Sequence, residues 1–203
     1  MHRNTVIWTG MGLLYAAFLS WHISFSPALS PLEWRQSVHA TGMDVDDLPP
    51  EFAAFFDGDD GRAFLMINIL DHADSATYPP GPFAHITDAS EAARRYGTGV
   101  VPKLFLRGSY PLLQANRIVT LLNDIPAEAD RFEALAVVRY RSRRDFLDLL
   151  LDPGFQDLTV HKWASLDGTI VIPAQRVFVS NLALWVPLAL IVLGTGLTLR
   201  RRS

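Results

Sequence analysis

Long apolar runs stand at both ends of the chain, and a more varied pattern lies between them. The first run spans residues 5–25 and the second spans residues 177–199, and neither contains Asp, Glu, Lys or Arg. A helix rises about 1.5 Å per residue, so about 20 residues cross the hydrocarbon core of a bilayer. Both runs reach that length, and the pattern therefore predicts a transmembrane helix at each end.

Basic residues stand on the outer flank of each run. Arg3 precedes the first run, and arginines fill positions 200–202 after the second. Because basic flanks favour the cytoplasmic side, we expect a protein of the bacterial inner membrane with two spans. Both termini would be cytoplasmic, and residues 26–176 would be extracytoplasmic.

Removal of either run by processing is a weaker interpretation. The apolar stretch of residues 5–25 exceeds the usual length of about 7–15 residues in a signal peptide. The second run and its arginines resemble bacterial sorting tails that are cut off after export, but the full motif of such tails is missing. We therefore expect both runs to be retained.

Residues 26–60 are interpreted as a connector with two short helices. Ser30-Pro31 and Pro49-Pro50 each place proline at a helix start, where its missing N–H costs nothing. Acidic residues gather after these helices. A calcium loop that began at Asp57 would need a glutamate at its twelfth position, which is Asn68. A solvated acidic linker is the better interpretation.

Residues 61–175 alternate between strand and helix patterns. Apolar segments typical of strands are followed by segments that open with capping residues, such as Asp88 and Ser142. The order is β-α-β-β-α-β, which predicts an α+β, ferredoxin-like domain with a four-stranded antiparallel sheet and both helices on one face. The expected strands are residues 63–70, one or two pieces within 110–122, 132–140 and 169–173; the expected helices are 88–106, 142–152 and 154–166.

The first expected strand is apolar on both of its faces. Leu65, Ile67 and Ile69 lie on one face, and the alternate positions are also apolar except for Asn68. One face packs on the helices, so the other needs a different cover. A second copy of the same sheet is the simplest cover, which predicts a homodimer or a larger membrane complex.

Composition narrows the possible chemistry. The net charge of −3 is small and basic residues are scattered between the termini, so a nucleic-acid partner is not expected. The chain has no cysteine, which excludes disulfides, thiolate metal sites and cysteine nucleophiles. His72 and His85, with the nearby Asp71 and Asp74, match no zinc spacing. We expect neither a metal site nor an obligatory cofactor.

Three segments carry a resemblance to a known group of proteins. FLMINIL, EAARRYGTGVVPKL and the run from FEALAVVRYRSRRDFLDLLLDPGFQ to TIVIP resemble a small bacterial family of uncharacterised function. That family belongs to the dimeric α+β-barrel superfamily, together with EthD-like and antibiotic-biosynthesis-monooxygenase-like proteins. The resemblance covers about residues 62–174 and implies the fold and a dimer. It implies no reaction, because this fold hosts many activities.

The candidate site combines five residues. Asn68, His161 and Tyr96 are the candidate catalytic residues, and Arg139 and Tyr140 are candidates for ligand binding. Asn68 is either a polar handle in a pocket or a structural amide. His161 is either a general base or a packed residue. Arg139 either holds a carboxylate or pairs with an acidic residue nearby.

The resemblance also implies a haem alternative. In haem-degrading relatives an asparagine on the first strand and a histidine on a late helix serve the cofactor, and Asn68 and His161 occupy comparable places. The expected aromatic partner has no clear match in this chain.

Two functions remain open on the sequence alone. The first is a membrane-anchored accessory or scaffold protein that binds a membrane partner or a small apolar ligand. The second is a cofactor-poor or haem-linked enzyme of the monooxygenase or isomerase type that uses Asn68, His161 and Tyr96.

Overall fold

A computed structural model describes residues 2–120, 130–175 and 182–199. The chain forms two compact units. One consists of the terminal segments, Met1–Phe25 and Arg176–Ser203, and the other is the domain Ser26–Gln175. Each unit is described by itself.

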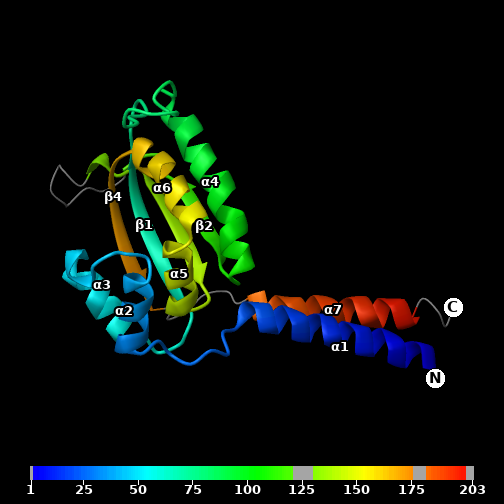
Figure 1. Ribbon diagram of the computed structural model, residues 1–203. Helices are drawn as coiled ribbons and strands as arrows, with labels where there is room; N and C mark the ends of the chain where they lie inside the picture. The colour runs from blue at the N-terminus through cyan, green and yellow to red at the C-terminus, as the bar shows by residue number, and fades with distance from the viewer. Residues whose placement is uncertain (1, 121–129, 176–181, 200–203) are drawn as a thin grey trace. The chain divides into compact units, whose positions relative to one another are not determined.

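The domain is built on a four-stranded antiparallel sheet (Figure 1). Its strands are β1 (Phe64–His72), β2 (Tyr110–Asn116), β3 (Ala134–Tyr140) and β4 (Leu166–Ala174). Their order across the sheet is β2-β3-β1-β4, and every neighbouring pair is antiparallel. The prediction of an α+β domain with such a sheet is confirmed.

Three helices connect the strands and lie over one face of the sheet (Figure 1). They are α4 (Ala89–Leu106), α5 (Arg143–Leu150) and α6 (Pro153–Ala164). Each begins with a side-chain cap: Asp88 accepts from Ser90 N, Ser142 from Asp145 N, and Asp152 from Gly154 N. These short-range bonds satisfy N–H groups that lack partners within the helix, which is why the helix starts could be read from sequence.

The main core lies between this helical layer and the sheet. Phe64 and Met66 of β1 pack with Tyr140 of β3 and with buried residues of the helices, including Leu104 and Leu149. Because side chains alternate along a strand, the even-numbered residues of β1 face the helices. Asn68 therefore faces the helical layer as well.

The segment before β1 belongs to the same core. It contains α2 (Pro31–His39), a short 3-10 helix η1 (Val45–Asp47) and α3 (Pro50–Asp57). Trp34 and Phe56 are fully buried, and Trp34 Nε1 donates to Asp57 at 2.8 Å. The two helices assigned to a connector are thus part of the domain's packing.

The opposite face of the sheet, which we call the open face, is apolar. The register places Ile67 between Val137 of β3 and Ile172 of β4. Ile172 is 42% exposed and Leu113 of β2 is 49% exposed. Leu65, Ile69 and Ile170 lie on this face by the same alternation.

The terminal unit contains two helices, α1 (His2–His22) and α7 (Leu182–Leu199). Tyr15 of α1 donates to the carbonyl of Ala183 at 3.1 Å. Gly194 of α7 lies so close to α1 that an added Cβ would stand 2.7 Å from Trp8. The two ends of the chain therefore pack as a helix pair.

The prediction of two membrane spans is wrong on this structure. Across residues 2–120, 130–175 and 182–199, none of the helices has both the length and the apolar character that a bilayer crossing requires. Of the second apolar run, residues 177–181 lie outside the described residues and the rest forms α7, and α1 includes polar residues such as Ser20 and His22. The predicted inner-membrane location depended on these two spans and is not supported. The same holds for the predicted cytoplasmic termini and extracytoplasmic domain.

Candidate functional site

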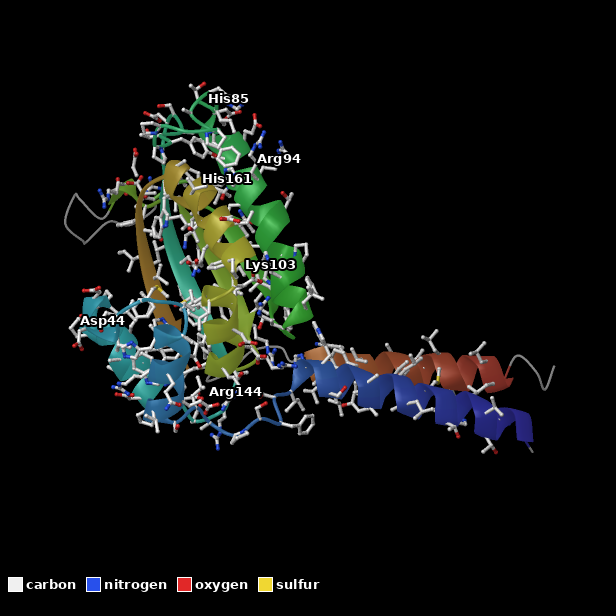
Figure 2. All side chains as sticks on the ribbon, viewed as in Figure 1. Asp44, His85, Arg94, Lys103, Arg144 and His161 are labelled. Atoms are coloured by element: carbon white, nitrogen blue, oxygen red, sulfur yellow. The ribbon has the colours of Figure 1, made fainter. Side chains whose placement is uncertain are left out.

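A cleft of about 610 Å³ opens between α6 and the loop that connects β1 to α4. The loop contributes residues 78–83, which include three prolines and Phe83. The helix contributes Gln156, Asp157, Leu158, Val160 and His161. Figure 2 labels His161 on α6 and, above it in this view, His85 in the loop between β1 and α4. The walls of the cleft are mostly apolar.

The loop is fixed to the end of α6 by backbone hydrogen bonds. Ala73 N donates to Ser165 O and Thr77 N donates to Ala164 O, each at 3.1 Å. Ala76 N donates to Thr87 O at 2.8 Å, which closes the loop on itself. These bonds fix the loop wall of the cleft, and small-molecule sites are usually largely preformed.

His161 and Tyr78 form the polar centre of the cleft. The Tyr78 hydroxyl lies 2.8 Å from His161 Nδ1, and the imidazole is only 6% exposed. The Phe83 ring meets the imidazole edge-on with centroids 4.6 Å apart. These contacts hold the His161 ring in one orientation and engage one of its two nitrogens.

The environment keeps both groups neutral near pH 7. Burial, with a smaller contribution from the positive charge of Arg95, lowers the pKa of His161 below its ordinary value. Burial is also the main cause of the raised pKa of Tyr78. A neutral imidazole can accept or donate a proton at Nε2, since Nδ1 is engaged with Tyr78.

A second polar cluster lies between the sheet and the helices. Asn68 Nδ2 donates to the carbonyls of Met66 and Ala136 at 3.4 and 3.3 Å, and Lys162 Nζ lies 3.5 Å from Asn68 Oδ1. Lys162 also stands 5.9 Å from the centre of the Tyr96 ring. Asn68 and Tyr96 thus meet at Lys162, whereas His161 bonds to Tyr78 of the loop.

Burial shapes the protonation of this cluster. It lowers the pKa of Lys162 and raises the pKa of Tyr96 to about 12. Tyr140 is buried and stacks on Phe64 with centroids 5.2 Å apart, and its pKa is also raised by burial. Tyr140 is therefore a packed core residue beside this cluster.

Arg139 lies on the other face of the sheet. Its Nη1 donates to Gly108 O at 3.1 Å, and its guanidinium stands 5.4 Å from the centre of the Tyr110 ring. Glu133, an acidic residue six positions before Arg139, instead has its Oε1 3.2 Å from His72 Nδ1. The five candidate residues are therefore spread over three places.

Sequence reasoning did not identify Tyr78 or Lys162 as site residues. Tyr78 begins the loop motif YPPGPF, in which prolines limit the backbone and favour a fixed loop. Lys162 follows His161 on a helix whose neighbouring positions are largely apolar. A lysine among largely apolar positions of a helix is a signal that could have been noted.

The domain resembles solved structures of one protein in particular. Two crystal structures of RPA0582, a protein of unknown function from Rhodopseudomonas palustris, match with TM-scores of 0.57 and 0.55 and identities of 21% and 20%. The match to the methylated protein covers 68% of this chain and 97% of RPA0582. The match to the other structure covers 66% of this chain and 98% of RPA0582. These matches show a shared fold with uncharacterised proteins.

A more remote match is the hydroxynitrile lyase of Passiflora edulis, with a TM-score of 0.38 and 12% identity over 58% of this chain and 97% of the lyase. No protein-family model matches the chain, and neither does any curated protein sequence.

Proposed function

We propose that the domain binds a small, mostly apolar molecule with one hydroxyl or carbonyl group in the cleft beside His161. The observation that carries this proposal is the buried His161, bonded to the half-buried Tyr78, in a cleft whose walls are mostly apolar. The volume of about 610 Å³ falls within the usual range of ligand sites, about 300–1,000 Å³. A few polar groups on apolar walls are also typical of such sites.

Tyr78 and His161 together can bind a single polar group of a ligand. Tyr78 engages Nδ1, and among the described residues His161 Nε2 has no hydrogen-bond partner. A ligand hydroxyl or carbonyl would complete the bonding of the ring, while its apolar body displaces water from Phe83 and the prolines. Because the imidazole is neutral, the site favours uncharged ligands over acids.

Ligand-observed NMR with cyclohexanone, benzyl alcohol and toluene tests this proposal on the full chain. We expect saturation transfer to the two oxygenated probes, with weaker transfer to toluene. Val160→Trp places a large side chain in the cleft and should abolish the saturation transfer. Thr98→Trp on the exposed side of α4 is the matched control and should leave it unchanged. Equal transfer in both tryptophan variants would contradict the proposal.

A second candidate function is an isomerase-type reaction at the same cleft. A neutral imidazole held by a tyrosine hydroxyl is a general base for a proton next to a carbonyl group. Exchange of the α-protons of cyclohexanone in D₂O, followed by NMR, tests this directly. We expect faster exchange with the wild-type chain than with His161→Gln, and equal rates would exclude it.

The haem alternative gains no support from the arrangement of its two residues. Asn68 bonds to Lys162 and to backbone carbonyls, and His161 bonds to Tyr78 in the cleft. This placement does not fit one haem site that is served by both side chains.

We also propose that two copies of the domain associate through the open face. Ile67, Val137 and Ile172 lie side by side on this face, and isoleucines of the edge strand β4 are partly exposed. An exposed apolar sheet face normally packs on another layer. A second copy offers a surface of the same apolar character.

A further inference from the structure

Lysine is rare in this chain, and its two copies have different surroundings. Lys103 and Lys162 are the only lysines in the sequence. Lys103 Nζ forms an ion pair with Asp152 at 3.1 Å. Among the described residues, no carboxylate lies within ion-pair distance of Lys162, whose nearest polar contact is the amide oxygen of Asn68. The two lysines therefore form a natural comparison.

Asn68 is turned so that it accepts from Lys162. Its Nδ2 donates to the carbonyls of Met66 and Ala136, which directs Oδ1 toward the amine. An amide oxygen accepts a hydrogen bond from a neutral amine as well as from an ammonium ion. A carboxylate at the same place would instead favour the ammonium ion.

Among the residues that the structure describes, no other group near Lys162 supplies negative charge. Tyr96 of α4 and Tyr140 of β3 are the titratable groups that face the cluster from the neighbouring elements, and burial raises the pKa of both phenols. They remain neutral at physiological pH. On α6 itself, His161 is also neutral, and the carboxylate of Asp157 lies in the wall of the cleft. Burial lowers the pKa of Lys162, because the cost of taking the charge out of water exceeds what the Tyr96 and Trp163 rings return through cation–π contact.

Apolar surface borders the amine where the sheet ends. Val171 of the edge strand β4 is the register partner of Asn68 and is 42% exposed. Trp163 follows Lys162, is 59% exposed, and its ring centre lies 5.3 Å from Nζ. A flat apolar molecule could therefore approach the amine along this edge and stack on an aromatic ring.

We propose that Lys162 is a nucleophilic amine site for small, apolar aldehydes or ketones. The neutral amine attacks the carbonyl carbon, and a proton moves from nitrogen to oxygen to give a carbinolamine. Loss of water then leaves an imine, and both hydrogens of the amine depart with the carbonyl oxygen. The reaction needs no oxidant or reductant. This site lies on the sheet side of α6 and does not depend on the cleft at His161.

Reductive labelling tests the proposal on the wild-type full chain. Benzaldehyde and cyanoborohydride at pH 7 convert an imine to a stable benzylamine, and peptide mass spectrometry separates Lys162, Lys103 and the terminal amine. Each unit by which an amine's pKa falls raises its neutral fraction about tenfold at this pH. We expect Lys162 to react about tenfold faster than Lys103 or more, and both to react equally in urea. Equal or slower labelling of Lys162 in the folded chain would overturn the proposal.

Asn68→Asp provides a second test of the proposal. The new carboxylate should hold Lys162 as an ammonium ion and suppress its labelling, while Lys103 keeps its rate. Circular dichroism checks that the variant is folded. If it is not, the ratio of the two lysines in the wild-type chain still decides the question. Undiminished labelling of Lys162 in a folded Asn68→Asp chain would count against the neutral-amine site.

Discussion

Gly99 of α4 faces Leu158 of α6 so closely that an added Cβ would lie 2.4 Å from the leucine Cδ2. Real side chains essentially never approach so closely, so the pair of helices is packed around the missing side chain. The same Leu158 lines the cleft beside His161. The distance between α4 and α6, and with it the shape of the cleft wall, therefore depends on a glycine at position 99.

Gly99→Ala should destabilise the domain although alanine is the better helix former. Overpacking of this kind costs about 1–3 kcal/mol, against a gain of up to about 1 kcal/mol from helix propensity. Gly97→Ala in the same helix is the matched control, because nothing lies within 4 Å of its new Cβ. Urea unfolding should show a loss for Gly99→Ala and a gain for Gly97→Ala. Equal gains would mean that the Leu158 side chain turns away from the new methyl group without cost.

Tyr78→Phe tests the hydrogen bond in the cleft. The change keeps the ring against Phe83 but leaves Nδ1 of the buried His161 without its partner. An unsatisfied buried group costs about 1–3 kcal/mol, which thermal unfolding would show as a lower Tm. Tyr96→Phe is the control, since among the described residues its hydroxyl makes no hydrogen bond. If the two variants are equally stable, Tyr78 does not hold the imidazole.

Much of the fold could be predicted because its signals are local. Capping residues at Asp88 and Ser142 mark helix starts within three residues of the groups they bind. The alternation along β1 also placed Asn68 on the same face as Phe64 and Met66, although it did not show which face meets the helices. In contrast, Trp34 and Asp57 meet across 23 positions of the chain. No local pattern shows that α2 and α3 join the core rather than a solvated linker.

The candidate site was harder to predict for the same reason. Tyr78 and His161 are 83 positions apart, and Asn68 and Lys162 are 94 apart. One error was avoidable. Arg139 and Tyr140 are consecutive residues of a strand and must face opposite sides of the sheet, so they could not line one pocket.

The stability of the domain should depend on pH through His161. Burial lowers its pKa in the folded chain, while the unfolded chain has the ordinary value near 6.5. As the pH falls through about 6.5, the unfolded chain takes up a proton that the folded chain does not, so folding becomes less favourable. The effect is absent well above that pH.

Urea unfolding between pH 7.5 and 5 would measure this dependence. We expect the free energy of unfolding to fall with pH in the wild-type chain and to fall less in His161→Gln, which cannot titrate. His85→Gln is a control histidine in the same loop region (Figure 2). Identical slopes for the wild-type chain and His161→Gln would show that the imidazole does not stay neutral in the folded chain.

The last prediction concerns self-association through the open face. Ile172 and Val171 are neighbours in β4, and each is 42% exposed. Ile172 shares the open face with Ile67, and Val171 shares the helix face with Asn68. Replacing each with aspartate therefore places the same charge at the same exposure on opposite faces of the sheet. A buried, unpaired charge in an interface costs several kcal/mol, so Ile172→Asp should separate the two copies.

Analytical ultracentrifugation of the full chain would measure the outcome. We expect the wild-type chain and Val171→Asp to be dimeric, and Ile172→Asp to be monomeric with its circular dichroism intact. Ile67→Asp should have the same effect from the centre of the face. Met66→Asp differs, because Met66 lies in the core and its replacement should unfold the domain. A dimer that survives both Ile172→Asp and Ile67→Asp would show that another surface joins the copies, since no arrangement of the open face can bury either carboxylate without loss.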